Sequence, residues 1–412
     1  MNKYICVRES FDYIYLGDGK EKLSNNEYRA LQKYLEENIR DNTNVIEGGY
    51  TKIRFINYVG ILKIKNVTIE VLPKISFSND KNKDRRILLE MLSKCLDLDI
   101  NLDKLINSNT QNYNLLDLIA NKYLEILMLE LNKGIFREYV NYSDNLKMIR
   151  GKIVLKEHMN KNYANKDRVF CSFDEYSENI LLNQVLKFAS EKILRNINNM
   201  DITKKCNKAL FKLSNVDIKY INKEILSRVQ INKQNKRFLQ VFELAKFIIL
   251  NMSNDSGRGM NNGFSMLFDM NTLYEKYTVK VIKEICTNKK VYLQDSKNYL
   301  LANKSNNKQS FNLRPDIVIQ DNVSTTIIDI KWKAVEYNSK NNYEISDIYQ
   351  MYAYASRYED AKKAVLLYPS LEEGKEYEAW TFIDNVNKEI EIKTVRLDSY
   401  NNTVEDLENI IN

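Results

Sequence analysis

The spacing of apolar residues changes along this chain of 412 residues, and no single fold class accommodates all of it. In residues 58–74 apolar side chains alternate with others on either side of Lys65-Asn66, which predicts a β-hairpin. In residues 84–251 they recur every three or four positions with no intervening proline, which predicts helices. From residue 264 onward helical and strand-like patterns alternate, which favours a mixed sheet with helices packed on it. We therefore expect a multidomain α+β protein.

The predicted domains follow these changes of pattern. Residues 1–83 are expected to form a β-rich N-terminal domain, 84–253 a helical middle region, 254–263 a Gly/Asn-rich linker and 264–412 an α/β domain whose mixed sheet is flanked by helices. The N-terminal domain should contain a strand in residues 4–16, then a helix in residues 23–40 with Ser24 as its N-cap. The middle helices are expected at residues 85–98, 113–133, 176–198 and 235–252. The C-terminal elements are expected at 264–287 (helix), 290–294, 312–320 and 325–331 (strands), 344–358 (helix) and 364–368 (strand).

Composition restricts the chemistry that the chain can perform. It has one histidine, His158, so catalysis by a histidine pair or triad is all but excluded. Its five cysteines are scattered without a CxxC pair, which speaks against a zinc knuckle, an iron–sulfur cluster or a disulfide framework. Carboxylates, lysines or a bound metal must therefore carry any reaction.

Neither a membrane span nor a secretion signal is expected. No run of about 18 apolar residues occurs, and the N-terminus lacks an apolar signal core, so the cytoplasm is the expected location. The net charge of +7 permits binding to nucleic acid without requiring it.

Two glycine-containing segments could be interpreted as phosphate-binding loops. Residues 254–263 hold three of the eleven glycines, and residues 17–20 read GDGK. Both lack the GxxxxGK[ST] pattern, and no strand leads into the first. A linker is the favoured interpretation of residues 254–263, and we expect no nucleotide to bind to this chain itself.

The candidate chemistry lies in residues 314–333, which read RPDIVIQDNVSTTIIDIKWK. Two strands joined by a short turn would bring Asp316 and Asp329 together at one end of a sheet, where such a pair could bind a divalent cation. Lys331 lies two residues after Asp329 and shares its face of the strand. Its ammonium could orient a water and offset charge on a phosphate.

The alternative is that these residues are structural, because PD and DxK both occur by chance. Three features favour function. The apolar runs IVI and TTII predict central strands, which leaves charged residues at their end unexplained. Glu275 lies on the preceding predicted helix, and Gln350 and Tyr354 lie one turn apart on the following one.

This order resembles the PD-(D/E)xK nuclease superfamily, in particular the branches with a glutamine on the helix after the lysine. The resemblance implies that Asp316 and Asp329 are metal ligands, that Lys331 is the catalytic lysine and that Glu275 is a further metal-site acid. Gln350 and Tyr354 would line the site. Lys333 is a weaker stand-in for Lys331. The implied cofactor is Mg²⁺, with Mn²⁺ also suitable.

Most of the chain is similar to one family, the McrC subunit of McrBC-type restriction systems (5-methylcytosine-specific or LlaJI-like). The similarity includes residues 58–75, 88–100, 149–162 and 169–189, of which the LPK segment and the RGKI and DEYSEN segments are the most diagnostic. It implies an endonuclease subunit that cuts double-stranded DNA and stimulates a ring-forming McrB-like AAA+ GTPase. The N-terminal half would bind that partner, and the nuclease domains could dimerise.

The residue that would reach the partner's nucleotide site is not identified by the resemblance. Arg54, Lys74 and Arg150 are candidates without an assigned role. The DNA could be methylated or unmodified.

A basic segment, residues 201–240, carries ten Lys or Arg against three acids, leaving +7. A DNA-backbone tract and a solvated helical face explain it equally well. The residues considered for DNA binding are Lys204, Lys205, Lys208, Lys212 and Arg237.

Two other functions stay open. The chain could be a non-catalytic activator or assembly subunit with a vestigial nuclease domain, although the intact Asp/Asp/Lys set speaks against decay. It could also be a stand-alone repair exonuclease, which leaves the McrC-like N-terminal half unexplained.

Overall fold

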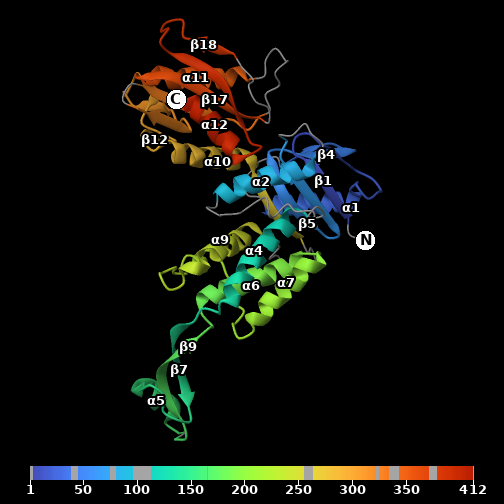
Figure 1. Cartoon of the computed structure of the whole chain (residues 1–412), viewed down its shortest axis with the longest axis vertical. Coiled ribbons are helices and arrows are strands. Elements are labelled where there is room, and N and C mark those ends of the chain that lie inside the picture. Colours follow the sequence, from blue (N-terminus) through green and yellow to red (C-terminus); the bar gives the residue numbers. More distant parts are fainter. Residues whose placement is uncertain are drawn as a thin grey trace. The chain divides into compact units, whose positions relative to one another are not determined.

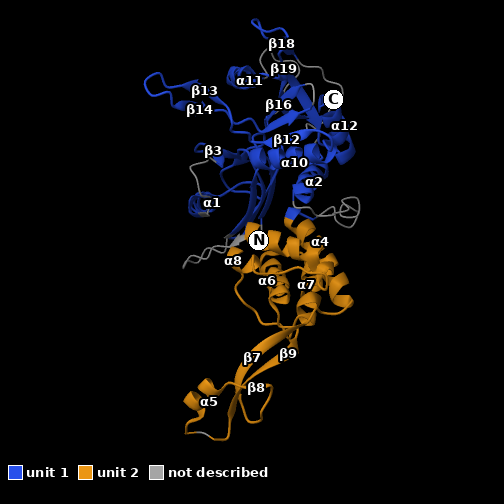
Figure 2. Ribbon diagram, turned by 90° about the vertical axis from the view of Figure 1, so that its left-hand side faces the viewer, with its two compact units in different colours: residues 1–115, 254–412 blue, residues 116–253 orange. Residues whose placement is uncertain are grey.

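The computed structural model describes residues 3–38, 45–74, 80–95, 113–164, 166–254, 263–321, 324–333, 343–370 and 378–411. The chain divides into two compact units, residues 1–115 with 254–412 and residues 116–253 (Figure 2). Within the described residues, no helix combines the length and apolar character that crossing a membrane requires. The arrangement of several sheets with packed helices confirms the expected mixed, multidomain class (Figure 1).

The first sheet of the larger unit contains the predicted hairpin. Lys65, at the turn, has a φ of 53°, as a tight turn between β5 and β6 requires. Residues 264–269, predicted as helix, instead form most of strand β11, whose pairing with β5 overrides the helical pattern. Gly60 permits that pairing, because a Cβ there would lie 2.0 Å from the carbonyl oxygen of Met266. The sheet order is β1 (Lys3–Arg8), β6 (Val67–Leu72), β5 (Tyr58–Ile64), β11 (Gly263–Asp269) and β10 (Ser253–Asn254).

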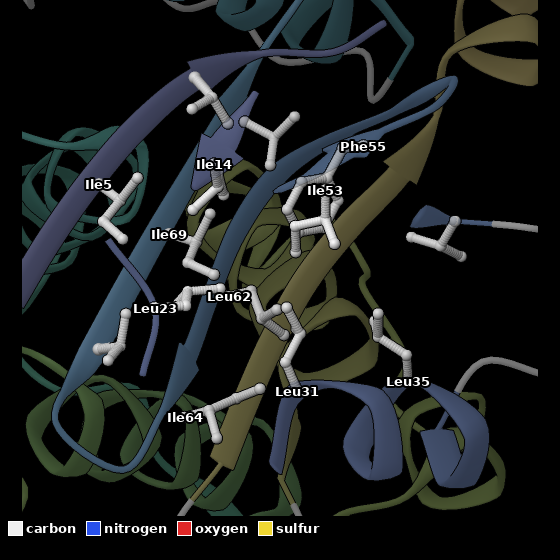
Figure 3. Packing of buried hydrophobic residues seen from close by; sticks show 14 of the residues in the cluster. Ile5, Ile14, Leu23, Leu31, Leu35, Ile53, Phe55, Leu62, Ile64 and Ile69 are labelled. Atoms are coloured by element: carbon white, nitrogen blue, oxygen red, sulfur yellow. The ribbon is translucent and has the colours of Figure 1, made fainter. Parts of the chain in front are cut away.

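A second small sheet and a helix complete the N-terminal region. The predicted strand 4–16 is interrupted after β1, where Ser10 has a φ of 58°. The predicted cap of α1 is confirmed, since Ser24 N–H donates to Glu27 Oε2 at 2.8 Å and Glu27 N–H donates to Ser24 Oγ at 3.4 Å. Figure 3 shows the apolar core that these elements share. They are β2 (Ile14–Tyr15), α1 (Asn25–Asn38), β3 (Ile46–Gly48) and β4 (Lys52–Phe55).

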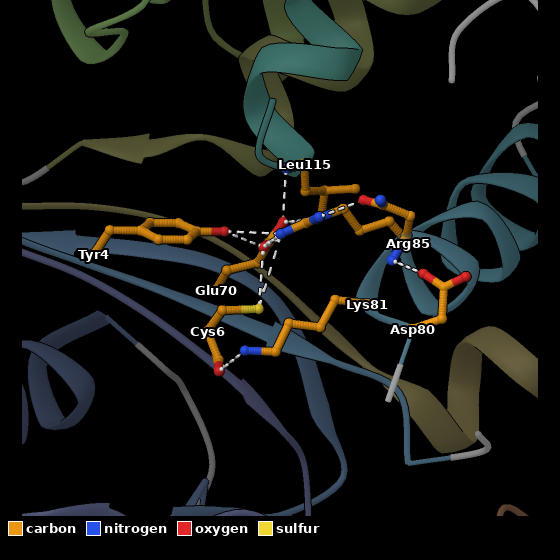
Figure 4. A network of polar contacts seen from close by, with 8 residues as sticks. Tyr4, Cys6, Glu70, Asp80, Lys81, Arg85 and Leu115 are labelled. Carbon is orange, nitrogen blue, oxygen red and sulfur yellow. Dashed lines mark hydrogen bonds and ion pairs between the residues drawn. The ribbon is translucent and has the colours of Figure 1, made fainter. Parts of the chain in front are cut away.

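A buried ion pair joins β6 to helix α2 (Lys81–Cys95). Glu70 is fully buried and receives Arg85 Nη2 at 2.6 Å. Glu70 Oε1 also accepts from the N–H of Leu115, the first residue of α4 (Leu115–Asn132), at 2.8 Å. Tyr4 OH donates to the same carboxylate (Figure 4). Glu70 thus joins strand β6, helix α2 and the first residue of α4.

The smaller unit contains three of the four predicted middle helices, since the one expected at 85–98 corresponds to α2 of the larger unit, and also a sheet that we did not predict. Residues 138–177, assigned to the helical region, form an antiparallel pair with a short third strand that extends away from the helices of this unit (Figure 2). Strand β7 buries none of its residues, and the buried residues of β9 are confined to its first half, so the apolar spacing contained no clear strand signal. The sheet consists of β7 (Glu138–Leu146), β8 (Lys152–Ile153) and β9 (Val169–Ser177), with α5 (Leu155–Asn162) beside it. The remaining helices are α6 (Leu181–Asn196), α7 (Met200–Lys212), α8 (Lys223–Leu226), η2 (Lys236–Phe238) and α9 (Leu239–Asn251).

The C-terminal sheet follows the predicted order of helix, three strands, helix and strand. β12, β15 and β16 are antiparallel, whereas β17 and β19 continue parallel to β16. A hairpin, two further strands and a last helix were not predicted: β13 (Tyr299–Ala302), β14 (Gln309–Asn312), β18 (Ala379–Thr381), β19 (Glu389–Arg396) and α12 (Tyr400–Ile411). The predicted elements are α10 (Met270–Ile285), β12 (Lys290–Leu293), β15 (Ile317–Gln320), β16 (Thr325–Ile330), α11 (Ile345–Arg357) and β17 (Ala361–Ser370). The proposed linker falls largely in residues 255–262, outside the described residues.

We expect Glu70→Ala to lower the free energy of unfolding by about 3–5 kcal/mol, because it leaves the Arg85 guanidinium buried without its partner. Urea denaturation of the full chain measures this. Glu47→Ala, which removes the partner of Arg54 in an exposed pair, serves as the control and should change stability little. Equal effects of the two substitutions would contradict the structural role given to Glu70.

Candidate active site

The strand registers place the two predicted carboxylates side by side. Ile317 of β15 pairs with Ile328 of β16, so Asp316, the residue before β15, lies beside the end of β16 that carries Asp329. Asp316 is also joined to β12, because Gln294 N–H donates to the carbonyl oxygen of Asp316 at 2.9 Å. The charge of Asp329 acts on Asp316 and raises its pKa. The two carboxyl groups therefore lie near one another at one end of the sheet.

The two carboxylates differ in burial and in hydrogen bonding. Asp316 is half-buried, and its Oδ2 accepts from Ile330 N–H at 2.8 Å. Asp329 is 3% exposed, and its Oδ2 lies 2.7 Å from Lys331 Nζ. The Lys331 ammonium is thus the partner of this buried oxygen, which accepts no hydrogen bond from another described residue. Carboxylate oxygens are also the ligands that divalent cations such as Mg²⁺ prefer.

Burial and like charge oppose ionisation of both carboxyl groups. Burial, followed by the charge of Asp329, raises the pKa of Asp316 to about 7. Burial also raises the pKa of Asp329, against the opposing effect of Lys331. Burial alone would lower the pKa of Lys331, but the carboxylates of Asp329, Asp347 and Asp316 outweigh it and raise that pKa. The site therefore holds a stable cation beside two carboxyl groups that a second cation would stabilise in ionised form.

Helix α11 holds Lys331 in place. Lys331 Nζ donates to Gln350 Oε1 at 3.1 Å, and Gln350 Nε2 donates to Tyr354 OH at 2.8 Å. Tyr354 OH then donates to the carbonyl oxygen of Arg314 at 3.2 Å. The structure thus brings Gln350 and Tyr354 together with the lysine, and the chain of hydrogen bonds returns to the segment that carries Asp316.

Asp347 is a site residue that the sequence analysis missed. It is 6% exposed in the first turn of α11, with Oδ1 3.8 Å from Lys331 Nζ and Oδ2 3.0 Å from Lys333 Nζ. Lys333 also pairs with Glu344 at 3.0 Å, and no ion pair joins it to Asp329 among the described residues. Asp347 precedes Gln350 by three positions, which places both on one helical face and was the available signal.

Glu275 lies near the aspartates but is otherwise engaged. Its Oε1 accepts from Gln294 Nε2 at 2.8 Å, and Gln294 Oε1 accepts from the Arg314 guanidinium. Its charge contributes to the raised pKa of Asp316 and of Asp329. Within the described ranges, no group of three or more His, Cys, Asp and Glu side chains is placed to hold a metal ion. Asp316 and Asp329 are thus brought together, whereas Glu275 is held by Gln294.

Trp332 anchors the end of β16 on the opposite face and was also missed. Its indole N–H donates to Glu9 Oε1 at 2.7 Å, and its ring packs against Tyr274 of α10 with centroids 5.3 Å apart. Glu9 is fully buried and accepts from Asn57 N–H at 2.7 Å. The strand end that carries Lys331 is therefore tied to the N-terminal sheet of the same unit.

The residues considered for DNA binding lie in the smaller unit. Lys205 donates to Asn121 Oδ1 at 2.6 Å. Arg237, in η2, donates to the carbonyl oxygens of Glu130 at 3.1 Å and Gly134 at 2.6 Å. Arg237 is therefore engaged at the C-terminal end of α4 and is not grouped with the lysines. The four lysines share helix α7: Lys204, Lys205, Lys208 and Lys212.

The three candidates for the partner's nucleotide site lie on separate elements. Arg54, in β4, pairs with Glu47 at 2.5 Å. Lys74 follows β6 and is half-buried, and burial lowers its pKa. Arg150 precedes β8 and lies 3.4 Å from a carboxylate oxygen of Glu175. Arg54 and Lys74 thus belong to the larger unit and Arg150 to the smaller one.

Comparison with solved structures identifies chains of the same fold. One belongs to the refined half-complex from the tetradecameric assembly of Thermococcus gammatolerans McrB AAA+ hexamers with bound McrC. It aligns with a TM-score of 0.73 and 20% identity, covering 99% of this chain and 100% of that chain. A chain of the cryo-EM structure of the Thermococcus gammatolerans McrBC complex aligns with a TM-score of 0.54 and 21% identity, covering 68% and 87%. At these identities the likeness shows a shared fold.

A match to a family model assigns the chain to a protein family, which the shared fold alone does not do. No curated protein matches this sequence. The model described as "McrBC 5-methylcytosine restriction system component" matches residues 53–369, more than half of the chain. This match confirms the family to which the sequence motifs pointed: the chain belongs to the McrBC 5-methylcytosine restriction system component family.

Proposed function

We propose that this chain is the Mg²⁺-dependent DNA endonuclease subunit of a two-component restriction system driven by nucleotide hydrolysis, with GTP as the nucleotide. The observation that carries the proposal is the proximity of Asp316, Asp329 and Lys331 at one end of the sheet. The strand order around them, with three antiparallel strands and a following helix that contributes Gln350, supports a PD-(D/E)xK nuclease fold.

The side chains present fit a magnesium ion. Asp316 and Asp329 offer carboxylate oxygens, which Mg²⁺ prefers as ligands. Asp329 Oδ2 is buried, and its partner among the described residues is the Lys331 ammonium at 2.7 Å. We propose that these two carboxylates hold the ion, with Glu275 as an additional acid, and that Mn²⁺ can replace it. A bound ion of this kind lowers the pKa of a water and neutralises phosphate charge.

The chain's own residues would position the reactants. Lys331 would donate a hydrogen bond to the attacking water and offset the charge that develops on the phosphate oxygens. Gln350 and Asp347 restrict where its ammonium can lie, because both contact it from α11. The water oxygen bonds to phosphorus as the bond from phosphorus to the leaving sugar oxygen breaks, which hydrolyses one DNA strand.

The partner in this proposal comes from the comparisons. The related half-complex contains McrC bound to McrB AAA+ hexamers. We infer that a McrB-like ring-forming AAA+ GTPase binds this chain and is stimulated by it. Double-stranded DNA is the proposed substrate. That half-complex comes from a tetradecameric assembly, and we include dimerisation of the nuclease domains in the proposal.

Asp329→Ala should abolish plasmid cleavage by the complete mixture of this chain, its AAA+ partner, GTP and Mg²⁺, because one of the two proposed metal ligands is removed. Stimulation of GTP hydrolysis should persist. The control is Asp360→Ala, which removes an exposed carboxylate from the same domain and should leave cleavage unchanged. If the Asp329→Ala mixture cut as fast as wild type, the chain would be an activator; cutting by the wild-type chain alone would indicate an autonomous nuclease.

Lys331→Ala should slow cleavage at least about 100-fold, the usual effect of losing a donor that stabilises transition-state charge. Lys333→Ala is the matched control, since that ammonium pairs with Glu344 and Asp347, and it should retain most of the rate. Single-turnover cleavage by the complete mixture measures both. The assignment of the catalytic lysine would be reversed if Lys333→Ala were the slower variant.

Without metal, the free energy of unfolding should fall as the pH rises from about 4 to about 7. The pKa of Asp316 is about 7 in the folded chain and about 3.9 when unfolded, so between these values the folded state binds more protons. Asp316→Asn should reduce this fall, leaving the part that comes from the raised pKa of Asp329, and Asp360→Asn should not change it. Urea denaturation in EDTA at several pH values measures it.

Addition of Mg²⁺ at pH 8 should raise the unfolding temperature of wild type, because the ion binds the ionised carboxylates of the folded state. The double variant Asp316→Asn/Asp329→Asn should show no such rise. If Mg²⁺ stabilised wild type and the double variant equally, Asp316 and Asp329 would not be the metal ligands.

A further inference from the structure

A basic hairpin stands immediately before the first candidate metal ligand. Strands β13 and β14 pair with each other and with no other sheet. The surrounding segment, residues 296–314, contains Lys297, Lys304, Lys308 and Arg314 and no acidic residue, which gives it a charge of +4. Figure 2 shows the pair projecting from the body of its unit. The hairpin is therefore a positively charged appendage of the nuclease-like sheet.

The hairpin exposes its side chains. Residues 300–309 are all exposed, and neither Lys304 nor Lys308 forms an ion pair with a described residue. Phe311 is 68% exposed and has a φ of 60°, a conformation that a bulky side chain rarely adopts. Leu301 is 57% exposed. An exposed aromatic ring on strained backbone is unfavourable for folding alone and is typical of a contact site.

The base of the hairpin is firmly attached. Asn312 Nδ2 donates to the carbonyl oxygen of Ser296 at 2.8 Å, and Leu313 N–H donates to that of Asn298 at 2.8 Å. Arg357 of α11 donates to the carbonyl oxygen of Tyr299 at 2.9 Å. Leu313 itself belongs to the core under α11. The hairpin therefore keeps its direction relative to the strand that follows.

The hairpin base also lies close to the candidate active site. Asn312 ends β14, and only three residues separate it from Asp316. Four residue steps span at most about 14 Å. A two-stranded ribbon can enter the DNA major groove, which is about 12 Å wide. A duplex whose phosphate reaches Asp316 would thus lie within reach of Lys304, Lys308 and Phe311.

We propose that the β13–β14 hairpin is a DNA-contacting ribbon that seats the duplex against the active site. Lys304 and Lys308 neutralise backbone phosphates, and Phe311 contacts a sugar or base. The charge of the segment favours a polyanion over a second copy of this chain, which would present the same segment with its charge of +4. This inference rests on the proposed function, because it places the substrate of that same site.

Fluorescence anisotropy of the full-length chain with a labelled 30-base-pair duplex tests the proposal, with Ca²⁺ replacing Mg²⁺ to prevent cleavage. Lys304→Ala/Lys308→Ala should weaken binding roughly tenfold and lower the slope of log K against log salt by about 1.8, the value for two lost phosphate contacts. Lys20→Ala/Lys362→Ala removes two exposed lysines from the same unit and should change neither quantity.

Phe311→Asn provides a second variant, because asparagine tolerates the left-handed backbone. It should weaken binding roughly fivefold or more without lowering stability. In addition, bromodeoxyuridine-containing duplex should crosslink to residues 299–312 in the complete complex. The proposal would be overturned if both hairpin variants bound the duplex as wild type does, or if the control variant lost as much affinity as the hairpin variants. It would also be overturned if wild type bound no DNA, or if crosslinks formed only outside residues 299–312.

The outcomes separate this inference from the proposed nuclease function. If hairpin variants bind normally while Asp329→Ala abolishes cleavage, the hairpin inference fails and the nuclease proposal stands. If binding depends on the hairpin while Asp329→Ala complexes still cut, the hairpin contact stands and the active-site assignment fails.

Discussion

The antiparallel pairing of β15 with β16 is the constraint on which the candidate site depends. It brings Asp316 beside the end of β16 that carries Asp329, and burial together with the charge of Asp329 opposes the ionisation of Asp316. One ammonium group, that of Lys331, lies beside the two carboxyl groups. Lys331 follows Asp329 by two residues and therefore projects from the same face of the strand as Asp329. The single positive charge of the lysine does not neutralise two carboxylates. A divalent cation at this end of the sheet would balance the remaining negative charge.

Helix α11 converts this charge arrangement into a defined geometry. Asp347, Gln350 and Tyr354 lie on the face that packs over the sheet, and the first two contact the Lys331 ammonium. Tyr354 then reaches back to the carbonyl oxygen of Arg314. A long lysine side chain loses much rotamer freedom when it is held in this way. Helix α11 therefore fixes the position of the Lys331 ammonium, while the strands carry the two carboxyl groups and the lysine.

The same strand end is coupled to the N-terminal region through Trp332. The residues after Asp329 alternate faces, so Lys331 points toward α11 and Trp332 points toward α10, where it packs on Tyr274 and donates to the buried Glu9. Leaving a buried carboxylate without a partner costs free energy. The hydrogen bond from Trp332 therefore stabilises Glu9 and at the same time fixes the end of β16. Any rearrangement of the N-terminal sheet at Glu9 would act on the strand that carries the proposed catalytic residues.

The sequence by itself determined the elements whose periodicity is strong: the 58–74 hairpin, the capped helix after Ser24, the apolar helices of the middle region and the DIK strand. It also pointed to the aspartates and lysine, because residue type and a period of two suffice for these, and its motifs resemble those of the family. Only the tertiary structure decided the rest. Strand β11 forms because β5 needs a partner, and β7–β9 pair through backbone hydrogen bonds that leave little apolar pattern. The engagement of Glu275 by Gln294, of Lys333 by Asp347 and of Glu9 by Trp332 depends on contacts between segments far apart in the chain, which local spacing does not encode.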